Sequence, residues 1–162
     1  MKSAEAIQKK IMTLEQAKSW IAALRVTGKK VSFTNGCFDI IHPGHLFSLQ
    51  QAAGQADFLI VGLNSDASVR KLKGPTRPIN STASRALVLA HLVVVDAVVV
   101  FEEETPLELI SALLPDVLVK GGDYTLEQVV GSKEVIAQGG KVIINPIVEG
   151  FSTTQLIEKI KK

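Results

Sequence analysis

The stretch VSFTNGCFDIIHPGHLF, Val31 to Phe47, decides the fold of this chain. Its opening residues predict a short buried strand, and a glycine-containing loop follows. Pro43 and Gly44 then mark the start of a helix, since proline fits the first helical turn. Strand, loop and helix in this order form the first unit of an open α/β sheet, in which ligands bind beyond the carboxyl ends of the strands.

Strands and helices alternate along the rest of the chain. Upstream, Thr13 and Gln16 stand at capping-box spacing and Gly28 is a stop signal, so a leading helix is expected between them. Downstream, further buried strands are predicted at 57–63, 97–101, 116–120 and 141–145. Helices are predicted at 43–55, 64–72, 81–93, 106–114, 132–138 and 152–162.

Short apolar strands separated by helices indicate a parallel sheet with both faces covered. We therefore predict the α/β fold class, as a single doubly wound, Rossmann-like domain over 1–162 with a five-stranded parallel sheet. Its N-terminal helix region is expected to span 1–29 and its Rossmann-like core 30–162. Thr105 and Pro106 are expected to be the cap and the first-turn proline of the helix after the third strand.

The composition excludes several classes of protein. With 46% hydrophobic and 21% charged residues the chain can form a core, and its net charge of +2 is too small for a nucleic-acid footprint. The most apolar run, at 92–101, is shorter than the roughly 20 residues of a membrane-spanning helix. The single Cys37 leaves no intramolecular disulfide. We expect a cytoplasmic protein that binds neither nucleic acid nor a membrane.

Two of the three histidines stand together in the quoted stretch. His42 precedes the predicted helix and His45 lies in its first turn, so the two side chains can face one spot. The helix start adds unpaired N–H groups, and Gly36 and Gly44 let the backbone approach a ligand closely. The loop is therefore predicted to hold a phosphate group and to stabilise negative charge that develops on it.

Three other readings of the histidine pair remain. The pair could ligate zinc, although only Cys37 and His91 are available as further soft ligands. The two residues could also be hydrogen-bonded structural histidines, or one could be the general base of a hydrolase. The last reading is disfavoured because the chain has no G-x-S-x-G elbow, Walker loop or G-x-G-x-x-G run.

The same residues carry a resemblance to a known family. TNGCFD followed by HPGH resembles the His-x-Gly-His signature of the nucleotidyltransferase superfamily, which includes glycerol-phosphate and phosphoethanolamine cytidylyltransferases and pantetheine-phosphate adenylyltransferase. Five further segments resemble one branch, the D-glycero-β-D-manno-heptose 1-phosphate adenylyltransferases, over about Ile11 to Lys161. They are VGLNSDASVRKLKGPTRPIN, VDAVVVFEEETPLELI, PDVLVKGGDY, GSKEVIAQGGKV and EGFSTTQLIEKI.

The resemblance implies transfer of AMP from ATP to the anomeric phosphate of a heptose, giving ADP-heptose and pyrophosphate for lipopolysaccharide or surface glycans. It assigns His42 and His45 to stabilising charge on the α-phosphate, without a covalent enzyme intermediate. Mg²⁺ is expected as a cofactor carried by the ATP phosphates. A separate heptose kinase and phosphatase are expected pathway partners, and a homodimer is expected.

Residues from Arg70 to Arg85 include five cations and no carboxylate. A solvated basic face is the common meaning of such a run. The family, however, places a loop lysine and a helical arginine near the phosphates, which implies that Lys73 joins His42 and His45 as the third catalytic residue. The expected nucleotide-binding residues are Thr34, Asn35, Gly36, Phe38, Gly44, Arg85, Lys120, Gly121, Ser152, Thr153 and Thr154. The expected substrate-binding residues are Asp39, Asn64, Asp66, Arg77, Gly122 and Asp123.

Several of these residues have a simpler alternative role. Asp39 could make a structural hydrogen bond in its loop, Asp123 could cap a tight turn, and one of the two residues Asn64 and Asp66 could cap a short helix. Ser152 to Thr154 begin the last helix and could act only as its N-cap. Six further residues are expected to be structural or solvent-facing: Cys37 as a small buried residue, His91 as a packed histidine, and Lys71 and the run 102–104 in solvent.

Two other functions stay open. One is cytidylyl transfer to glycerol 3-phosphate or a related small phosphate, and the other is a non-catalytic nucleotide-binding regulatory module. The cytidylyltransferase relatives carry an arginine a few residues before their Ser-Thr pair, where this chain has Ile147, Val148 and Glu149. That difference favours the heptose branch.

Overall fold

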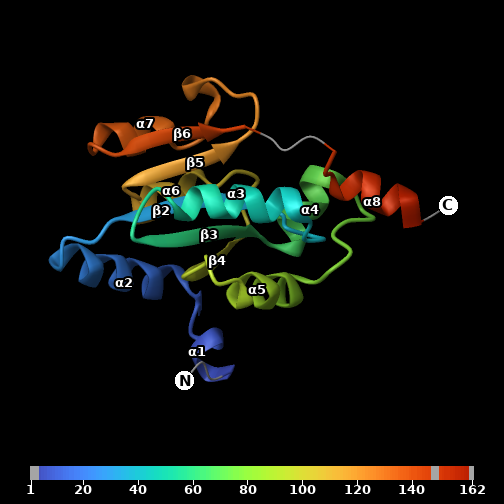
Figure 1. The fold of residues 1–162 in the computed structure, drawn as a ribbon, viewed down its shortest axis with the longest axis horizontal. Coiled ribbons are helices and arrows are strands. Elements are labelled where there is room, and N and C mark those ends of the chain that lie inside the picture. Colours follow the sequence, from blue (N-terminus) through green and yellow to red (C-terminus); the bar gives the residue numbers. More distant parts are fainter. Residues whose placement is uncertain (1–3, 147–149, 161–162) are drawn as a thin grey trace.

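The structure, a computed structural model, describes residues 4–146 and 150–160. It is built on one parallel sheet in the order β1-β4-β3-β2-β5-β6 (Figure 1). The strands are β1 (Ile11–Met12), β2 (Val31–Gly36), β3 (Phe58–Asn64), β4 (Ala97–Phe101), β5 (Val117–Gly121) and β6 (Lys141–Asn145). The α/β class and the parallel sheet are confirmed, but the sheet has six strands and the predicted five is wrong.

The additional strand is β1 at the edge of the sheet. It pairs with β4 through Ile11 beside Val98 and Met12 beside Val99. A strand of two residues is too short to show any periodicity in the sequence, so only its pairing reveals it. It lies inside the predicted N-terminal helix region 1–29, which therefore contributes to the sheet.

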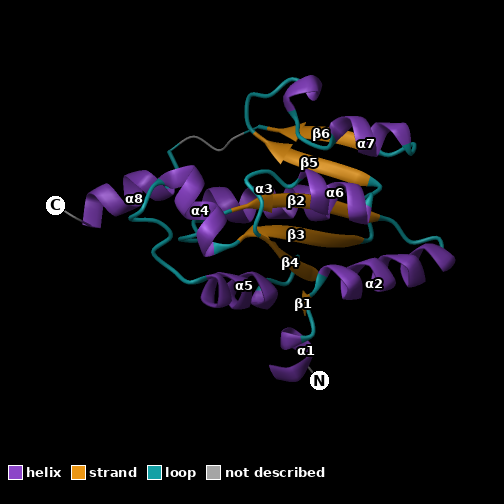
Figure 2. Ribbon diagram, turned by 180° about the vertical axis from the view of Figure 1, so that it is seen from behind, coloured by secondary structure: helices purple, strands orange, loops and turns teal. Residues whose placement is uncertain are grey.

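Helices cover both faces of the sheet. They are α1 (Ala4–Gln8), α2 (Leu14–Val26), α3 (Pro43–Ala53), α4 (Asp66–Lys73), α5 (Thr82–His91), α6 (Leu107–Leu113), α7 (Ser132–Ala137) and α8 (Thr153–Ile160), with a 3-10 turn η1 (Leu126–Gln128). Helix α3 lies in front of the sheet in Figure 1, and α6 lies in front of it in the reverse view of Figure 2. The predicted double winding is thus confirmed, whereas α1 was not predicted.

Each face of the sheet has its own apolar core, and β3 contributes side chains to both. Leu59 and Val61 belong to the core with α3 and α5, while Ile60 belongs to the core with α2, α6 and α7. A Cβ at Gly62 would lie 2.6 Å from the Phe33 ring, so this strand position must be glycine. Each fully buried aliphatic side chain contributes roughly 1.5–3 kcal/mol, which makes the sheet a firm support for the loops at its ends.

Local signals predicted one helix start and one helix stop correctly and a second helix start wrongly. Thr13 and Gln16 form the predicted capping box of α2, and Gly28, the predicted stop, follows the C-cap residue Thr27 with a left-handed backbone, φ +70°. Thr105 does not cap α6, because that helix begins one residue later, with Pro106 at the N-cap position and no side-chain hydrogen bond. The predicted cap at Thr105 is therefore wrong.

The sheet reverses its order at β2. From β2 the chain moves to β3 and β4 on one side, and then returns to β5 on the other side of β2. The loops that follow β2 and β5 consequently diverge and leave a crevice at the carboxyl ends of these strands. In the described part of the chain, no helix is long and apolar enough to cross a membrane.

Candidate active site

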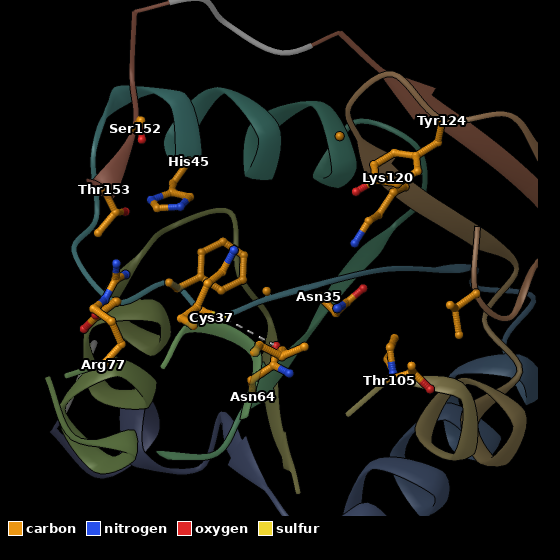
Figure 3. A pocket seen from close by; sticks show the side chains of 18 of the residues that line it. Asn35, Cys37, His45, Asn64, Arg77, Thr105, Lys120, Tyr124, Ser152 and Thr153 are labelled. Carbon is orange, nitrogen blue, oxygen red and sulfur yellow. Dashed lines mark hydrogen bonds and ion pairs between the residues drawn. The ribbon is translucent and has the colours of Figure 1, made fainter. Parts of the chain in front are cut away.

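A cavity of about 740 Å³ opens at the carboxyl ends of the central strands (Figure 3). Most of the predicted site residues line it: Asn35, Gly36, Phe38, Asp39, His42, His45, Asn64, Lys73, Arg77, Lys120, Gly121, Ser152, Thr153 and Thr154. Six predicted residues do not: Thr34, Gly44, Asp66, Arg85, Gly122 and Asp123. Among the lining residues that were not predicted to bind are Cys37, Glu104, Thr105, Tyr124 and Phe151.

The two histidines stack on each other at the mouth of α3. Their ring centroids are 3.7 Å apart and their planes differ by 20°. His42 is the N-cap residue of α3, and its Nδ1 accepts a hydrogen bond from the backbone N–H of His45 at 3.3 Å. A neutral His42 with Nδ1 as acceptor carries its proton on Nε2, which leaves that N–H to donate to a ligand.

Both imidazoles favour the neutral form. Burial lowers the pKa of His42. It lowers the pKa of His45 further, to about 4, together with the charge of His42 and against the nearby Ile40 carbonyl. Nδ1 of His45 is buried and makes no hydrogen bond of normal geometry among the described residues. The pair therefore offers neutral N–H donors, and a bound anion would favour their protonation.

The strand end before the histidines is shaped by Phe38. This residue has a left-handed backbone with φ 45°, and its ring centroid lies 5.2 Å from that of His45. A Cβ at Gly36 would lie 2.9 Å from the Phe38 ring. Glycine at position 36 thus permits Phe38 to pack where it supports His45.

Gly44 lies behind His42 rather than in the cavity lining. A Cβ at this position would lie 3.1 Å from the His42 ring and 3.1 Å from Cβ of Phe151. The missing side chain lets the segment before α8 approach the first histidine. Thr153 makes a second contact there, since its hydroxyl donates to the Ile40 carbonyl at 3.4 Å.

Arg85 is a buried structural centre below the cavity. It is 2% exposed, and each of its five N–H donors has a partner among backbone carbonyls and polar side chains. Its partners are the carbonyls of Cys37, Asn64 and Asn80, the hydroxyl of Thr82 and the carboxylate of Asp66, the last at 2.8 Å. The structure thus leaves Arg85 no donor for a nucleotide and makes it a positioning residue for the ends of β2 and β3.

Asp39 lines the cavity, but its carboxylate is engaged in a second network of structural hydrogen bonds. Its side chain is fully buried and accepts hydrogen bonds from Nε of Arg77 at 2.6 Å and from the backbone N–H groups of Ile79 and Asn80 at 2.9 Å. Burial raises its pKa, but these hydrogen bonds outweigh burial and hold the pKa below the usual value. Of the two roles expected for Asp39, the structure shows the structural one.

Asp66 and Asn64 are also engaged at the ends of their elements. The Asp66 carboxylate accepts from Thr82 and Arg85, and although burial opposes ionisation these contacts lower its pKa. The Asn64 amide donates to Ser68 at 2.9 Å and faces the Cys37 thiol at 4.0 Å, drawn as the dashed line in Figure 3. Burial raises the pKa of Cys37, so the thiol form is favoured.

Two lysines remain as cations without a carboxylate partner among the described residues of the cavity. Lys73 ends α4 and is exposed, while Lys120 ends β5 and lies with its Nζ 5.7 Å from the Tyr124 ring centroid. Burial lowers the pKa of Lys120, the Lys73 charge lowers it further and a Cys37 thiolate would raise it. The two ammonium groups thus repel each other electrostatically within one cavity.

Two predicted substrate residues lie away from the cavity. Gly122 has φ +132°, and its backbone N–H donates to the Asn145 carbonyl at 3.0 Å, which ties the turn to β6. Asp123 follows it in an exposed position. The Lys-Gly-Gly-Asp-Tyr turn thus supplies Lys120, Gly121 and Tyr124 to the cavity.

The loop after β4 was missed. Residues 102–104 were predicted to face solvent, and all three are exposed, but Glu104 together with Thr105 also lines the cavity. No sequence signal separated Glu104 from its acidic neighbours, because all three are exposed and identical in type. Separately, no three His, Cys, Asp or Glu side chains gather as a metal site in the described residues, which leaves the zinc reading unsupported.

The crevice, the stacked imidazoles and two lysines without a carboxylate partner among the described residues form a site suited to a phosphorylated ligand, at the sheet switch point of an α/β protein. The chain belongs to the Cytidylyltransferase-like family, whose sequence profile matches residues 33–159. The family resemblance predicted from the His-x-Gly-His residues is therefore confirmed.

Known relatives share most of this chain. It is 58% identical over 151 residues to the bifunctional protein HldE of Caulobacter vibrioides, covering 93% of this chain and 31% of that protein. It is 49% identical over 161 residues to HldE of Acidiphilium cryptum, covering 99% of this chain and 33% of that protein. The chain thus spans about a third of the length of these curated relatives.

Solved structures agree with the fold. A lipopolysaccharide core biosynthesis protein from Thermoplasma volcanium superposes with a TM-score of 0.61 at 26% identity, covering 75% of this chain and 98% of that one. Pantoate-beta-alanine ligase from Francisella tularensis superposes with a TM-score of 0.59 at 15% identity, covering 93% and 76%. The second likeness concerns the fold alone.

Proposed function

We propose that this chain transfers AMP from ATP to the anomeric phosphate of a heptose 1-phosphate, giving ADP-heptose and pyrophosphate as a precursor of lipopolysaccharide or surface glycans. The observation that carries the proposal is the stacked pair His42 and His45 at the start of α3, inside a cavity where Lys73 and Lys120 have no carboxylate partner among the described residues. The 58% identity to a bifunctional HldE over 93% of the chain supports the heptose branch.

The reaction needs little covalent chemistry from the protein. An oxygen of the sugar phosphate attacks the α-phosphorus of ATP, a new P–O bond forms, and the bond to the β-phosphate oxygen breaks so that pyrophosphate leaves with the electron pair. The attacking group is already an anion, so no base is required. The protein has to orient the two phosphates and neutralise the charge that gathers between them.

Each part of the cavity has a role in this scheme. His42 and His45 donate N–H groups to the α-phosphate oxygens, and Lys73 and Lys120 neutralise the phosphates on either side. Ser152 and Thr153 stand at the start of α8, where backbone N–H groups and the helix dipole favour an anion, so they are assigned to the leaving pyrophosphate. Asn35, Gly36, Phe38, Gly121 and Thr154 complete the nucleotide contacts.

Magnesium fits this site as a companion of ATP rather than as a protein-bound ion. Of the described lining residues, Asp39 has its carboxylate occupied by Arg77 and backbone N–H groups, which leaves Glu104 as one available carboxylate. A single carboxylate does not make a Mg²⁺ cage, whereas triphosphate oxygens and water do. Bound in this way, Mg²⁺ would supply further charge neutralisation.

The expected surroundings of the reaction belong to the same proposal. A heptose kinase and a phosphatase would supply the sugar 1-phosphate, the chain would work as a homodimer, and the use of ATP places the reaction in the cytoplasm. The residues 147–149, which favoured the heptose branch over the cytidylyl branch, lie outside the described residues.

A substrate screen tests the proposal. The four nucleoside triphosphates are each combined with heptose 1-phosphate, glycerol 3-phosphate and other small phosphates, and pyrophosphate release is measured. We expect ATP with heptose 1-phosphate to be turned over best. Preferred use of CTP with glycerol 3-phosphate would favour a cytidylyltransferase, and binding of ATP without turnover of any acceptor would favour a regulatory module.

A further inference from the structure

The loop after β4 presents the carboxylate of Glu104 to the cavity, whereas the carboxylate of Asp39, which also lines it, is occupied by Arg77 and backbone N–H groups. Glu104 lines this cavity, and no hydrogen bond or ion pair engages its side chain among the described residues. An unpaired carboxylate repels a polyphosphate, so Glu104 is unsuited to the phosphate part of a substrate. A carboxylate does accept hydrogen bonds from hydroxyl groups, and such charged bonds are strong.

A buried hydrogen-bond chain fixes the backbone next to Glu104. The Asn64 amide donates to the Ser68 hydroxyl at 2.9 Å, and that hydroxyl donates to the Glu103 carbonyl at 2.7 Å. Ser68 is fully buried and Asn64 is 2% exposed. Buried and satisfied chains of this kind are rigid, so the backbone that leads into Glu104 is fixed, and the exposed Glu104 side chain starts from a fixed position beside the cavity.

Thr105 offers a second group beside Glu104. Its hydroxyl does not cap α6 and has no hydrogen-bond partner among the described residues, although it lines the cavity. Figure 3 shows Thr105 on the same side of the cavity as Asn35 and Asn64, across from His45 and Thr153. Thr105 therefore lies across the cavity from the His45 and Thr153 side chains that are assigned to the phosphates.

We infer that Glu104 and Thr105 bind hydroxyl groups of the acceptor sugar and thereby select a polyhydroxylated phosphate as the substrate. This inference rests on the adenylyl transfer proposed above. The triphosphate lies against the histidines and α8, so the acceptor approaches the α-phosphorus from the side of the loop after β4. The two residues thus determine specificity, whereas His42, His45 and Lys73 serve the chemistry.

Two substitutions of nearly unchanged shape test the inference. Glu104→Gln keeps the size of the side chain but removes the negative charge, and Thr105→Val removes the hydroxyl. At saturating ATP we expect Glu104→Gln to raise KM for heptose 1-phosphate about 10- to 100-fold and Thr105→Val to raise it a few-fold, as for loss of a charged and a neutral hydrogen bond. Calorimetric affinity for ATP should stay within about twofold of wild type.

Glu102→Gln is the matched control, because Glu102 is an exposed neighbour in the same acidic run and does not line the cavity. It should leave both constants unchanged. A loss of ATP affinity in Glu104→Gln with an unchanged acceptor KM would overturn the inference and assign the carboxylate to the ribose of ATP. Wild-type values for both substrates would overturn it too.

Failure of the proposed function is recognised separately, since wild-type protein would then release no pyrophosphate with heptose 1-phosphate. In that case direct binding of sugar phosphates is compared by calorimetry between wild type and Glu104→Gln. Equal affinities overturn the inference, and a weaker affinity of the variant supports it without the reaction.

Discussion

The polar residues that support the cavity and those that face a ligand differ in how fully they are hydrogen-bonded. Among the supporting residues, Arg85 uses five donors and Asp39 accepts from Arg77 and two backbone N–H groups. Among the ligand-facing residues, within the described part of the chain, Nδ1 of His45 is buried without a hydrogen bond and Lys73 has no carboxylate partner. Buried polar groups that have all their hydrogen bonds make the surrounding structure rigid, so the first set builds the site. Buried groups without a partner raise the free energy of the folded protein until a ligand supplies one, so the second set is available for binding.

The largest effect on stability should come from removing the hydrogen bonds of Arg85. Arg85→Leu fills a similar volume but leaves three carbonyls and the Asp66 carboxylate without their donor. We expect it to lower the free energy of unfolding by about 3–5 kcal/mol, because each buried carbonyl that loses its donor costs about 1–3 kcal/mol. Arg85→Lys keeps the charge but has three donors, so it should fall between Leu and wild type. Denaturant titration measures all three proteins.

Arg70→Leu is the control for this prediction. Arg70 is an exposed arginine on α4, near in sequence to the same elements, and its loss should change stability by less than about 0.5 kcal/mol. Equal losses in the two variants would show that Arg85 does not hold the site together and would remove the contrast drawn above.

The next effect should appear at the cavity surface. His42→Ala and His45→Ala should each lower kcat by about 10²–10³, as for loss of an oxyanion donor, while ATP affinity changes less. Steady-state pyrophosphate release together with ATP calorimetry measures both quantities. Turnover close to wild type in either variant would contradict the role given to the stacked pair.

His42 also caps α3, so its two roles have to be separated. Alanine removes the cap and should destabilise the protein by about 1 kcal/mol, whereas asparagine is a good N-cap residue. His42→Asn should therefore regain the stability lost in His42→Ala but keep its low kcat. Recovery of both properties would mean that the ring acts only as a cap.

A further effect should be a pH dependence of stability, which vanishes at neutral pH and grows as the pH is lowered. The pKa of His45 is about 4 in the folded protein against 6.5 for the free side chain, because of burial and the His42 charge. Between these values the unfolded chain binds more protons, so the free energy of unfolding falls as the pH is lowered from 6.5 toward 4. His45→Gln lacks this group and should lose less stability over that range.

Urea titrations at several pH values between 6.5 and about 4 measure this slope. His91→Gln is the control, since His91 is exposed on α5 away from the cavity, and it should keep the wild-type slope. An identical slope in His45→Gln and wild type would mean that His45 is not held neutral by its surroundings.

The α/β architecture could be predicted from the sequence because the signals for strands and helices lie within short stretches of the chain. The runs at 97–101 and 141–145 were predicted at the bounds that the structure shows, and the capping box before α2 was found from two residues. Strand β1 was not predictable, since two residues acquire strand character only by pairing with β4. Register and pairing are tertiary properties that a short window of sequence does not contain.

Site residues were harder to separate than strands. Lys73 and Arg85 belong to one basic run and were assigned similar roles, but one reaches the cavity while the other is buried under it. Likewise Glu104 could not be told from its acidic neighbours until the Asn64 and Ser68 chain was seen to hold its loop. Which cations and carboxylates are already paired depends on contacts distant in sequence, and this decides their function.

The position of Gly44 has no room for a side chain without a shift of its neighbours. Because a single methyl group at position 44 would touch both the first imidazole and the segment leading into α8, the C-terminal helix and the phosphate-binding loop are spaced by the absence of one carbon atom. The start of α8 thereby forms one wall of the cavity, and a change that shifts this helix would alter the shape of the cavity before it reached the hydrophobic interior.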